Sequence, residues 1–268
     1  MEKYINYNAL LNTLFEQWEN SYDENERKRF CKDGLMLIPD NPNPDNLSYV
    51  DELWEKSERR IMFLLKDSPD GGQDDIRYWL VNKEDCRNLK SGCVGRTGFL
   101  LNIAMMLYGL MITKKGYRLG YSEVSETKMD EVKKTWNSTP FALVETKKLA
   151  GKPTVSREEI EKAIQKDNLF LAKEIDILKP NIIICCDAEN TQFDFITQTY
   201  FKGRDAIIKQ YEHPASKRIK CCLYYYDKDN VVVIQSFHPT RRGKEDWMIY
   251  ERVISPLGTL MNNDNPDF

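Results

Sequence analysis

The sequence predicts an α/β fold in which a central, mainly parallel β-sheet lies between two layers of helices. Short apolar runs typical of buried strands recur along the chain, at residues 61–65, 141–144, 182–186 and 231–234. Segments with helical spacing separate these runs, and this alternation favours parallel strands that are covered on both faces. Polar residues follow each run directly. Because ligands bind beyond the carboxyl ends of such strands, we expect one site formed by several strand ends.

The segments between the strands predict helices with recognisable limits. The clearest helix runs from Ser156 to about Leu178, because Ser156 and Glu159 match a capping box and Lys179-Pro180 ends the pattern. A hairpin is expected around 221–226, and His213, which follows no strand-like run, is expected in a loop. Residues 113–139 are polar and weakly periodic, which predicts an excursion at the surface. Further helices are expected over residues 5–33, 97–110, 190–202 and 245–260.

A turn-rich break divides the chain near its beginning. Residues 40–45, Asp-Asn-Pro-Asn-Pro-Asp, contain two prolines and no apolar residue. We therefore expect a helical N-terminal cap over residues 1–45, packed on an α/β domain over residues 46–260. Residues 261–268 are expected to form a tail.

Composition limits the possible functions. The chain has 268 residues, of which 30% are charged and 41% hydrophobic, as in ordinary globular proteins. The net charge of -3 means that nucleic-acid binding would need a local basic patch. No apolar stretch has the length of a membrane span, and we expect a cytoplasmic protein whose seven cysteines are reduced. With two histidines and no Cys-x-x-Cys, we expect no metal and no cofactor.

Five motifs follow one another in a particular order along the chain. They are Lys66-Asp67-Ser68-Pro69-Asp70, Cys93-Val94-Gly95-Arg96-Thr97-Gly98-Phe99-Leu100-Leu101, Val144-Glu145-Thr146-Lys147-Lys148, Leu178-Lys179-Pro180 and His238-Pro239-Thr240. This order resembles the uracil-DNA glycosylase superfamily over about residues 60–255. The resemblance implies a three-layer α/β/α sandwich of the uracil-DNA glycosylase type. It also implies a DNA base-excision glycosylase, which extrudes a base and hydrolyses its N-glycosidic bond.

The resemblance implies two catalytic residues. His238 would donate a hydrogen bond to the carbonyl oxygen of the departing base, where negative charge develops. Asp67 would position a water molecule or stabilise the sugar cation. The alternatives are a turn histidine and a solvated turn whose aspartates cap backbone amides.

The same resemblance implies substrate contacts, but several positions depart from the family pattern. Ser68 stands where some branches have a catalytic Asp, Cys93 where an aromatic residue stacks on the base, and Glu145 where an Asn reads uracil. Pro69 would shape the loop and Lys148 would follow the base-reading strand. The cysteines that hold an iron–sulfur cluster in one branch have no counterparts here.

Glu145 makes the sharpest prediction about the base. An ionised carboxylate offers only acceptors, so it suits a base edge with two adjacent donors and disfavours uracil, whose O4 is an acceptor. We therefore expect weak or no activity on uracil. The alternative is a strand-end glutamate paired with Lys147, Lys148 or Arg96.

A basic run follows the His-Pro turn. Arg241, Arg242 and Lys244 would hold DNA phosphates, or they form a solvated surface. Two other functions remain open. One is a nucleic-acid-binding module that keeps the fold but has lost catalysis, which Ser68 and Cys93 favour. The other is an N-glycosidase that acts on free nucleosides and needs no basic face.

Overall fold

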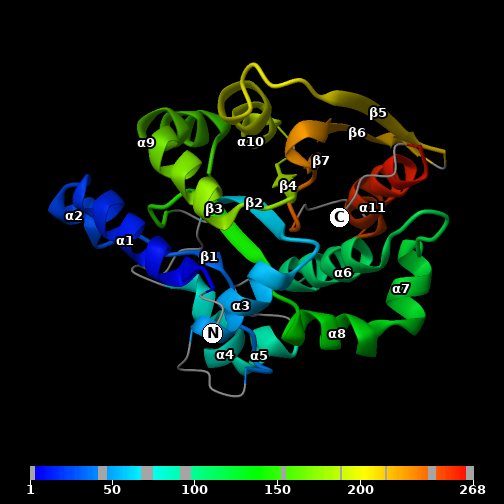
Figure 1. The fold of residues 1–268 in the computed structure, drawn as a ribbon, viewed down its shortest axis with the longest axis horizontal. Coiled ribbons are helices and arrows are strands. Elements are labelled where there is room, and N and C mark those ends of the chain that lie inside the picture. The colour runs from blue at the N-terminus through cyan, green and yellow to red at the C-terminus, as the bar shows by residue number, and fades with distance from the viewer. Residues whose placement is uncertain are drawn as a thin grey trace.

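The computed structural model describes residues 4–41, 47–67, 75–90, 98–151, 155–187, 189–214, 216–240 and 246–263. Within them, a seven-stranded mixed sheet crosses the molecule in the order β1-β3-β2-β4-β7-β6-β5 (Figure 1). The strands are β1 (Gly34–Leu35), β2 (Ile61–Asp67), β3 (Ala142–Lys147), β4 (Ile182–Cys186), β5 (Ile207–His213), β6 (Ser216–Tyr226) and β7 (Val231–Ser236).

The centre of the sheet is parallel and its two sides are antiparallel. Strands β3, β2, β4 and β7 pair in parallel, with Leu64 opposite both Val144 and Cys185. Strand β1 adds to β3 antiparallel, and the β5–β6 hairpin adds to β7 antiparallel. Three of the six strand pairings are therefore parallel, which corrects the prediction of a mainly parallel sheet. The predicted hairpin is confirmed.

Helices cover both faces of the sheet. Figure 1 shows α6 and α11 on one side and α1 and α9 on the other. The helices are α1 (Tyr7–Asn20), α2 (Glu24–Arg27), α3 (Ser48–Lys56), α4 (Trp79–Asn82), α5 (Glu84–Arg87), α6 (Phe99–Ile112), α7 (Tyr121–Thr127), α8 (Met129–Ser138), α9 (Arg157–Leu178), α10 (Thr191–Asp194) and α11 (Asp246–Asn263). Shorter turns are the 3₁₀ segments η1 (Ile76–Tyr78) and η4 (Asp227–Asp229) and the π-helical η3 (Phe195–Tyr200).

The two faces carry separate apolar cores because side chains alternate along each strand. Phe63, Leu143 and Ile184 belong to the core under α6 and α11. Leu64 and Val144 belong to the core under α1 and α9. We name these two sides of the sheet the α6 face and the α9 face.

The capping box of α9 is confirmed in detail. The Ser156 backbone N–H donates to Glu159 Oε2 at 2.8 Å, and the Glu159 N–H donates to Ser156 Oγ at 3.2 Å. At the other end Lys179 adopts a left-handed conformation, with φ of 47°, and Pro180 follows. The chain therefore passes directly from α9 into β4.

Three predictions need correction. Residues 113–139 are not an excursion at the surface, because α7 and α8 pack Val124, Val132 and Trp136 into the core. The N-terminal segment is not only a helical cap, since it contributes β1 to the sheet. His213, expected in a loop, is the last residue of β5.

The cysteines also differ from expectation in one case. Five cysteines are free thiols, namely Cys31, Cys185, Cys186, Cys221 and Cys222. Cys86 is disulfide-bonded, which corrects the prediction that every cysteine is reduced. Among the described residues, no helix is both long and apolar enough to cross a membrane.

Candidate active site

The carboxyl ends of β3, β2, β4 and β7 meet at one edge of the sheet, which we name the carboxyl rim. Asp67 lies opposite Lys147 at the ends of β2 and β3, and Cys186 lies opposite Ser236 at the ends of β4 and β7. His238 follows β7 by two residues. Asp67, Glu145 and His238 therefore lie near the carboxyl ends of three strands at one edge of the sheet. That they line one cleft stays a prediction.

Alternation along the strands also puts the key residues on one face. Phe63 and Leu65 of β2 lie in the core of the α6 face, so Asp67 continues on that face. Glu145 lies on this face as well, because it is two residues after Leu143 in β3. Ser236 does too, because it is two residues after Ile234 in β7. Strands β2 and β7 are separated only by β4, so their axes lie about 10 Å apart. The rim therefore brings acidic and hydroxyl groups from three strands to one side.

Asp67 lies beside a cation. Its Oδ2 is 3.9 Å from Lys147 Nζ, and both side chains are largely buried. Lys147 Nζ is held in turn by the Leu149 carbonyl oxygen at 2.6 Å. Gly151 lies against this pair, because a Cβ there would come within 2.8 Å of Lys147 Nζ. The Asp67 carboxylate is thus oriented at the end of its strand, where an ammonium group offsets its charge.

Glu145 is buried deeper in the same face. Only 2% of the residue is exposed, and Oε2 has no hydrogen-bond partner among the described residues. Burial raises the pKa of the Glu145 carboxyl well above its ordinary value, and the charges of Asp33 and Asp67 raise it further. The smaller opposing effects of Lys148 and Lys147 lower it. Oε2 forms no hydrogen bond with Lys147 or Lys148, and Arg96, the third partner that the sequence left open, lies outside the described residues.

Two residues of the same face were not predicted. Ser236 ends β7, and its buried Oγ has no hydrogen-bond partner within the described part of the chain. Cys186 ends β4, and burial raises the pKa of its thiol, as do the charges of Asp187 and Glu145. The sequence does contain a signal that could have found them. Alternate residues of a strand lie on the same face, so Ser236 shares the face of Ile234 and Cys186 shares the face of Ile184.

His238 is fixed by the turn that follows it. Its Nδ1 accepts the Thr240 backbone N–H at 3.2 Å and lies 2.7 Å from the Thr240 hydroxyl. The ring stacks on Phe99 of α6 with a centroid distance of 5.8 Å. Because a backbone N–H can only donate, the neutral ring carries its proton on Nε2. This tautomer makes Nε2–H a hydrogen-bond donor.

Asn102 of α6 anchors the same turn. Its Nδ2 donates to the Pro239 carbonyl oxygen at 2.8 Å and to Asp246 Oδ1 at 3.1 Å. The His-Pro-Thr turn is therefore tied to both α6 and the start of α11. No local pattern in the sequence predicts this role for Asn102, because it depends on contacts between distant segments.

Lys148 lies elsewhere than its predicted role requires. It is fully buried on the α9 face, where Nζ bonds both oxygens of Asp33 at 2.6 Å and lies 2.7 Å from Glu174 Oε2. The ammonium group also lies 5.0 Å from the centroid of the Trp18 ring. These partners account for the charge of Lys148 without a substrate. Its prediction as a substrate-binding residue is therefore replaced by a structural role.

Polar side chains on the α9 face hold the strand ends together. Gln192 Nε2 donates to Thr146 Oγ1 at 2.9 Å, and Thr146 Oγ1 donates to the Leu65 carbonyl oxygen at 2.6 Å. Asp187 accepts the backbone N–H groups of Asn190 at 2.8 Å and Gln192 at 2.9 Å. These bonds connect the ends of β2, β3 and β4 with α10.

Six predicted site residues lie outside the described residues. They are Ser68, Pro69, Cys93, Arg241, Arg242 and Lys244. Two of the segments that hold these residues begin directly after a described residue, which is Asp67 in one case and Thr240 in the other. Both of these described residues lie at the carboxyl rim.

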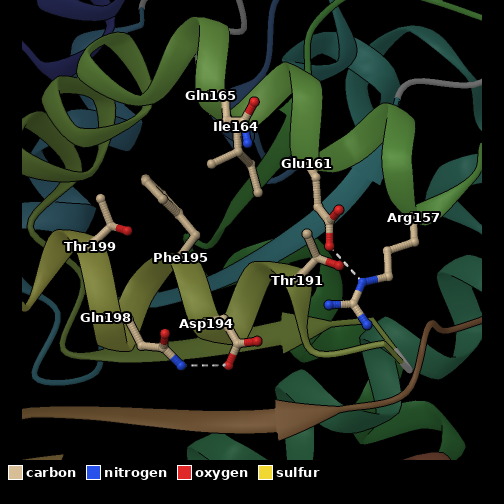
Figure 2. A pocket seen from close by; sticks show the side chains of 9 residues that line it. All are labelled: Arg157, Glu161, Ile164, Gln165, Thr191, Asp194, Phe195, Gln198 and Thr199. Atoms are coloured by element: carbon tan, nitrogen blue, oxygen red, sulfur yellow. Dashed lines mark hydrogen bonds and ion pairs between the residues drawn. The ribbon is translucent and has the colours of Figure 1, made fainter.

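A groove of about 190 Å³ opens on the other side of the sheet, between α9 and α10 with η3 (Figure 2). Its charged groups are already paired, since Arg157 Nε donates to Glu161 Oε1 at 2.6 Å and Gln198 Nε2 to Asp194 Oδ1 at 3.1 Å. It contains none of the predicted site residues. Its lining is Arg157, Glu161, Ile164, Gln165, Thr191, Asp194, Phe195, Gln198 and Thr199.

No group of three or more His, Cys, Asp or Glu residues in the described ranges is arranged to hold a metal ion. Comparison with protein-family models gives no match, and comparison with curated proteins gives none either. The resemblance to the uracil-DNA glycosylase superfamily therefore rests on the motifs and their order. What is established is an α/β protein with a seven-stranded, partly parallel sheet whose carboxyl rim gathers Asp67, Glu145 and His238.

Proposed function

We propose that this protein is a DNA base-excision glycosylase of the uracil-DNA glycosylase type, which hydrolyses the N-glycosidic bond of an extruded base. The observation that carries the proposal is the common position of Asp67, Glu145 and His238 at the carboxyl rim. Asp67 lies in β2, Glu145 lies in β3 and His238 follows β7, and the three positions fall in three of the motifs whose order resembles that of the family.

In this proposal His238 stabilises the leaving base. Its Nε2–H donor meets the base carbonyl oxygen, where negative charge develops as the glycosidic bond breaks. The support is the turn geometry, because the Thr240 N–H at 3.2 Å from Nδ1 fixes the tautomer before substrate arrives. A fixed donor needs no reorganisation during the reaction.

Asp67 acts at the sugar in the same proposal. An ionised carboxylate can orient the attacking water molecule or stabilise the cationic sugar. The support is its place at the strand end, 3.9 Å from Lys147 Nζ, which favours the ionised form. Water then adds to the anomeric carbon, and the base leaves with the bonding electron pair of the N-glycosidic bond.

An N-glycosidase acting on free nucleosides is the second candidate. The net charge of -3 favours it, because a small neutral substrate needs no basic surface. The same rim residues would serve, since the bond that breaks is the same. A binding module without catalysis is the third candidate.

The test is a panel of single- and double-stranded oligonucleotides carrying uracil, hypoxanthine, xanthine or mismatches, scored for abasic sites. We expect excision of at least one base. His238→Leu should reduce the rate roughly 10²–10³-fold, as does the loss of one oriented donor in other enzymes. Asp67→Asn should reduce it roughly 10²–10⁴-fold. Lys162→Met on the exposed surface of α9 is the control and should have little effect.

The negative outcomes separate the candidates. If no oligonucleotide yields abasic sites but free nucleosides are cleaved, the nucleoside N-glycosidase is correct. If neither substrate is cleaved and oligonucleotides still bind with strong salt dependence, the binding module is correct. Either result rejects the DNA glycosylase.

A further inference from the structure

The peptide group between Pro239 and Thr240 is held on both of its polar sides. Its carbonyl oxygen, which belongs to Pro239, accepts the Nδ2–H of Asn102 at 2.8 Å. Its N–H, which belongs to Thr240, donates to His238 Nδ1 at 3.2 Å. In a trans peptide group the C=O and the N–H lie in one plane and point in opposite directions. The contact with α6 and the contact with the His238 ring therefore depend on a single orientation of this plane.

The orientation of this plane decides which ring nitrogen of His238 carries the proton. In the observed orientation Nδ1 faces an N–H, so Nδ1 is the acceptor and Nε2–H is the donor. If the plane turned over, the Pro239 carbonyl oxygen would face Nδ1. That oxygen can only accept, so it would favour a proton on Nδ1 and leave Nε2 as an acceptor. The Thr240 hydroxyl, 2.7 Å from Nδ1, can donate or accept and so fits both tautomers.

Asn102 is placed to prevent this rotation. The residue is 4% exposed, and its backbone N–H bonds the Gly98 carbonyl oxygen at 2.8 Å at the start of α6. Its Nδ2 donates to Asp246 Oδ1 at 3.1 Å as well as to Pro239. Both partners are acceptors, which fixes the NH₂ side of the amide toward them. A rotated Pro239 carbonyl group would lose its donor in a buried contact, and such a loss is costly.

Phe99 supports the His238 ring from the same end of α6. It precedes Asn102 by three residues, so the two side chains lie on one face of the helix. The Phe99 ring stacks on the His238 ring with a centroid distance of 5.8 Å and an interplanar angle of 28°. Helix α6 therefore contacts both the imidazole ring and the peptide group that sets its tautomer.

We propose that Asn102 is a positioning residue of the proposed site, which holds the Pro239–Thr240 peptide group in the orientation that keeps His238 Nε2–H as a hydrogen-bond donor. Asn102 acts through Pro239 and Thr240 and does not itself contact the substrate. The catalytic consequence rests on the proposed function, in which Nε2–H stabilises the leaving base. The state of the ring can be measured without a substrate.

Nitrogen-15 NMR of the histidine rings is the direct test. The chain has two histidines, and His238→Leu identifies the His238 signals by their loss. The measurement is made at about pH 8, above the ordinary histidine pKa of about 6.5. A fixed tautomer then gives two well-separated nitrogen signals, and we expect the proton on Nε2 in the natural protein. A proton on Nδ1 would overturn the proposal.

Substitution of Asn102 should release the tautomer. Asn102→Ala removes the donor without adding an atom, and Ala is favourable in a helix. We expect the two nitrogen signals of His238 to move toward each other, as the proton becomes shared between Nδ1 and Nε2. Asn102→Leu is close to Asn in shape, also lacks a donor and should give the same result, so it replaces the Ala variant if that variant does not fold. An unchanged His238 spectrum in a folded variant would overturn the proposal.

Asn181 provides the matched control, because it makes the same kind of buried bonds at the other edge of the sheet. Its Nδ2 donates to the Glu58 carbonyl oxygen at 2.6 Å, and its Oδ1 accepts the Arg60 N–H at 2.8 Å. It directly precedes β4, away from the carboxyl rim. Asn181→Ala should lower the stability but leave the His238 spectrum unchanged. Equal changes of that spectrum in the Asn102 and Asn181 variants would show a general loosening of the fold and overturn the specific role of Asn102.

Kinetics add a second test where a base is excised. Asn102→Ala should lower kcat roughly 10–100-fold, because a small misplacement of a reacting group can cost this much, whereas KM should change little. In the His238→Leu background Asn102→Ala should cause no further loss, since residues that act through one another are not additive. Equal losses in both backgrounds would show that Asn102 acts independently of His238 and would overturn the proposal.

Failure of the inference differs from failure of the proposed function. Excision of a base together with an unchanged His238 spectrum in the Asn102 variants rejects the inference alone. Absence of excision on every substrate rejects the proposed function, and the His238 spectra then still decide whether Asn102 sets the state of the ring.

Discussion

At the scale of single residues, the fully buried cluster of Lys148, Asp33 and Glu174 is the feature with the largest energetic consequence. All three side chains are completely buried, and Lys148 is the only cation of the cluster. Burial raises the pKa of Glu174 well above its ordinary value, and the charge of Asp33 raises it further. The single ammonium group of Lys148 is therefore shared between two buried carboxyl groups.

This arrangement predicts unequal effects of substitution. Lys148→Met removes the cation that lies between two buried carboxyl groups and should lower the free energy of unfolding by about 3–5 kcal/mol. Glu174→Gln keeps a neutral acceptor and should cost at most about 1.5 kcal/mol. Chemical denaturation measures both.

The matched control is Lys162→Met on the surface of α9. Its partner Glu158 lies 2.7 Å away and both side chains are mostly exposed, so the change should stay within about 0.5 kcal/mol. Equal losses for Lys148→Met and Lys162→Met would contradict the account of the cluster.

The sequence predicted residue types at strand ends better than it predicted their environments. Glu145 and Lys148 are three residues apart and both follow the same apolar run, yet they serve opposite faces of the sheet. Alternation along β3 implies that difference. The buried partners Asp33 and Glu174 come from segments more than 25 residues away from Lys148, and no local pattern indicates them.

At the scale of helices and strands, the sequence predicted best those elements whose ends and apolar spacing are marked by local residues. The capping box and the terminating Lys179-Pro180 defined α9 from sequence. Helices α7 and α8 were missed because few apolar side chains, among them Val124, Val132 and Trp136, anchor them within charged surroundings. Their helical form is selected by packing against α6 and α11, which lie elsewhere in the chain.

The contact between α6 and α11 makes a prediction about packing. A Cβ at Gly109 would come within 2.6 Å of the Tyr250 hydroxyl and 2.8 Å of Ile254 Cδ1, both buried. Gly109→Ala should therefore force the helices apart and cost about 1–3 kcal/mol, despite the better helix propensity of Ala. Thermal or denaturant unfolding measures the loss.

Gly258 of α11 offers the matched control. A Cβ there meets only the side chain of Arg118, a part-exposed residue that can move. Gly258→Ala should therefore be neutral or slightly stabilising. A loss as large as that of Gly109→Ala would mean that the close approach of α6 and α11 does not explain the glycine at 109.

At the scale of the whole molecule, the parallel centre of the sheet was predictable and its sides were not. Four apolar runs identified β2, β3, β4 and β7, and their order along the chain implied that their ends share one rim. Strand β1 has two residues and carries no periodic signal. Strand β5 is polar and largely exposed, so neither alternation nor apolarity marked it as an extension of the sheet.

The same limit applies to the candidate site. Strand-end position predicted Asp67, Glu145 and His238, because the rim follows from topology. The donor tautomer of His238 and the raised pKa of Glu145 could not be predicted, since they depend on Thr240 bonding back to the ring and on the burial of a carboxyl group. Fold and placement are therefore readable from this sequence, whereas protonation states require the packed structure.

The charge of the molecule predicts how it would hold DNA. With a net charge of -3, attraction to DNA has to come from a local patch, and the basic run after Thr240 is the candidate closest to the rim. The double change Arg241→Ala/Arg242→Ala should weaken binding similarly for every DNA sequence. It should also flatten the slope of log K against log salt by about 1.8, if each arginine releases one counterion from duplex DNA.

The control removes the same charge from the far side of the sheet. Lys162→Ala/Lys173→Ala on α9 changes the net charge equally but should leave the slope nearly unchanged, because exposed charges farther than a Debye length of about 8 Å are screened. Titrations at several salt concentrations with a labelled duplex measure both variants. Equal slopes for the two double variants would show that the basic run does not hold phosphates. The attraction would then be a property of overall charge, and the free-nucleoside N-glycosidase would become the better candidate.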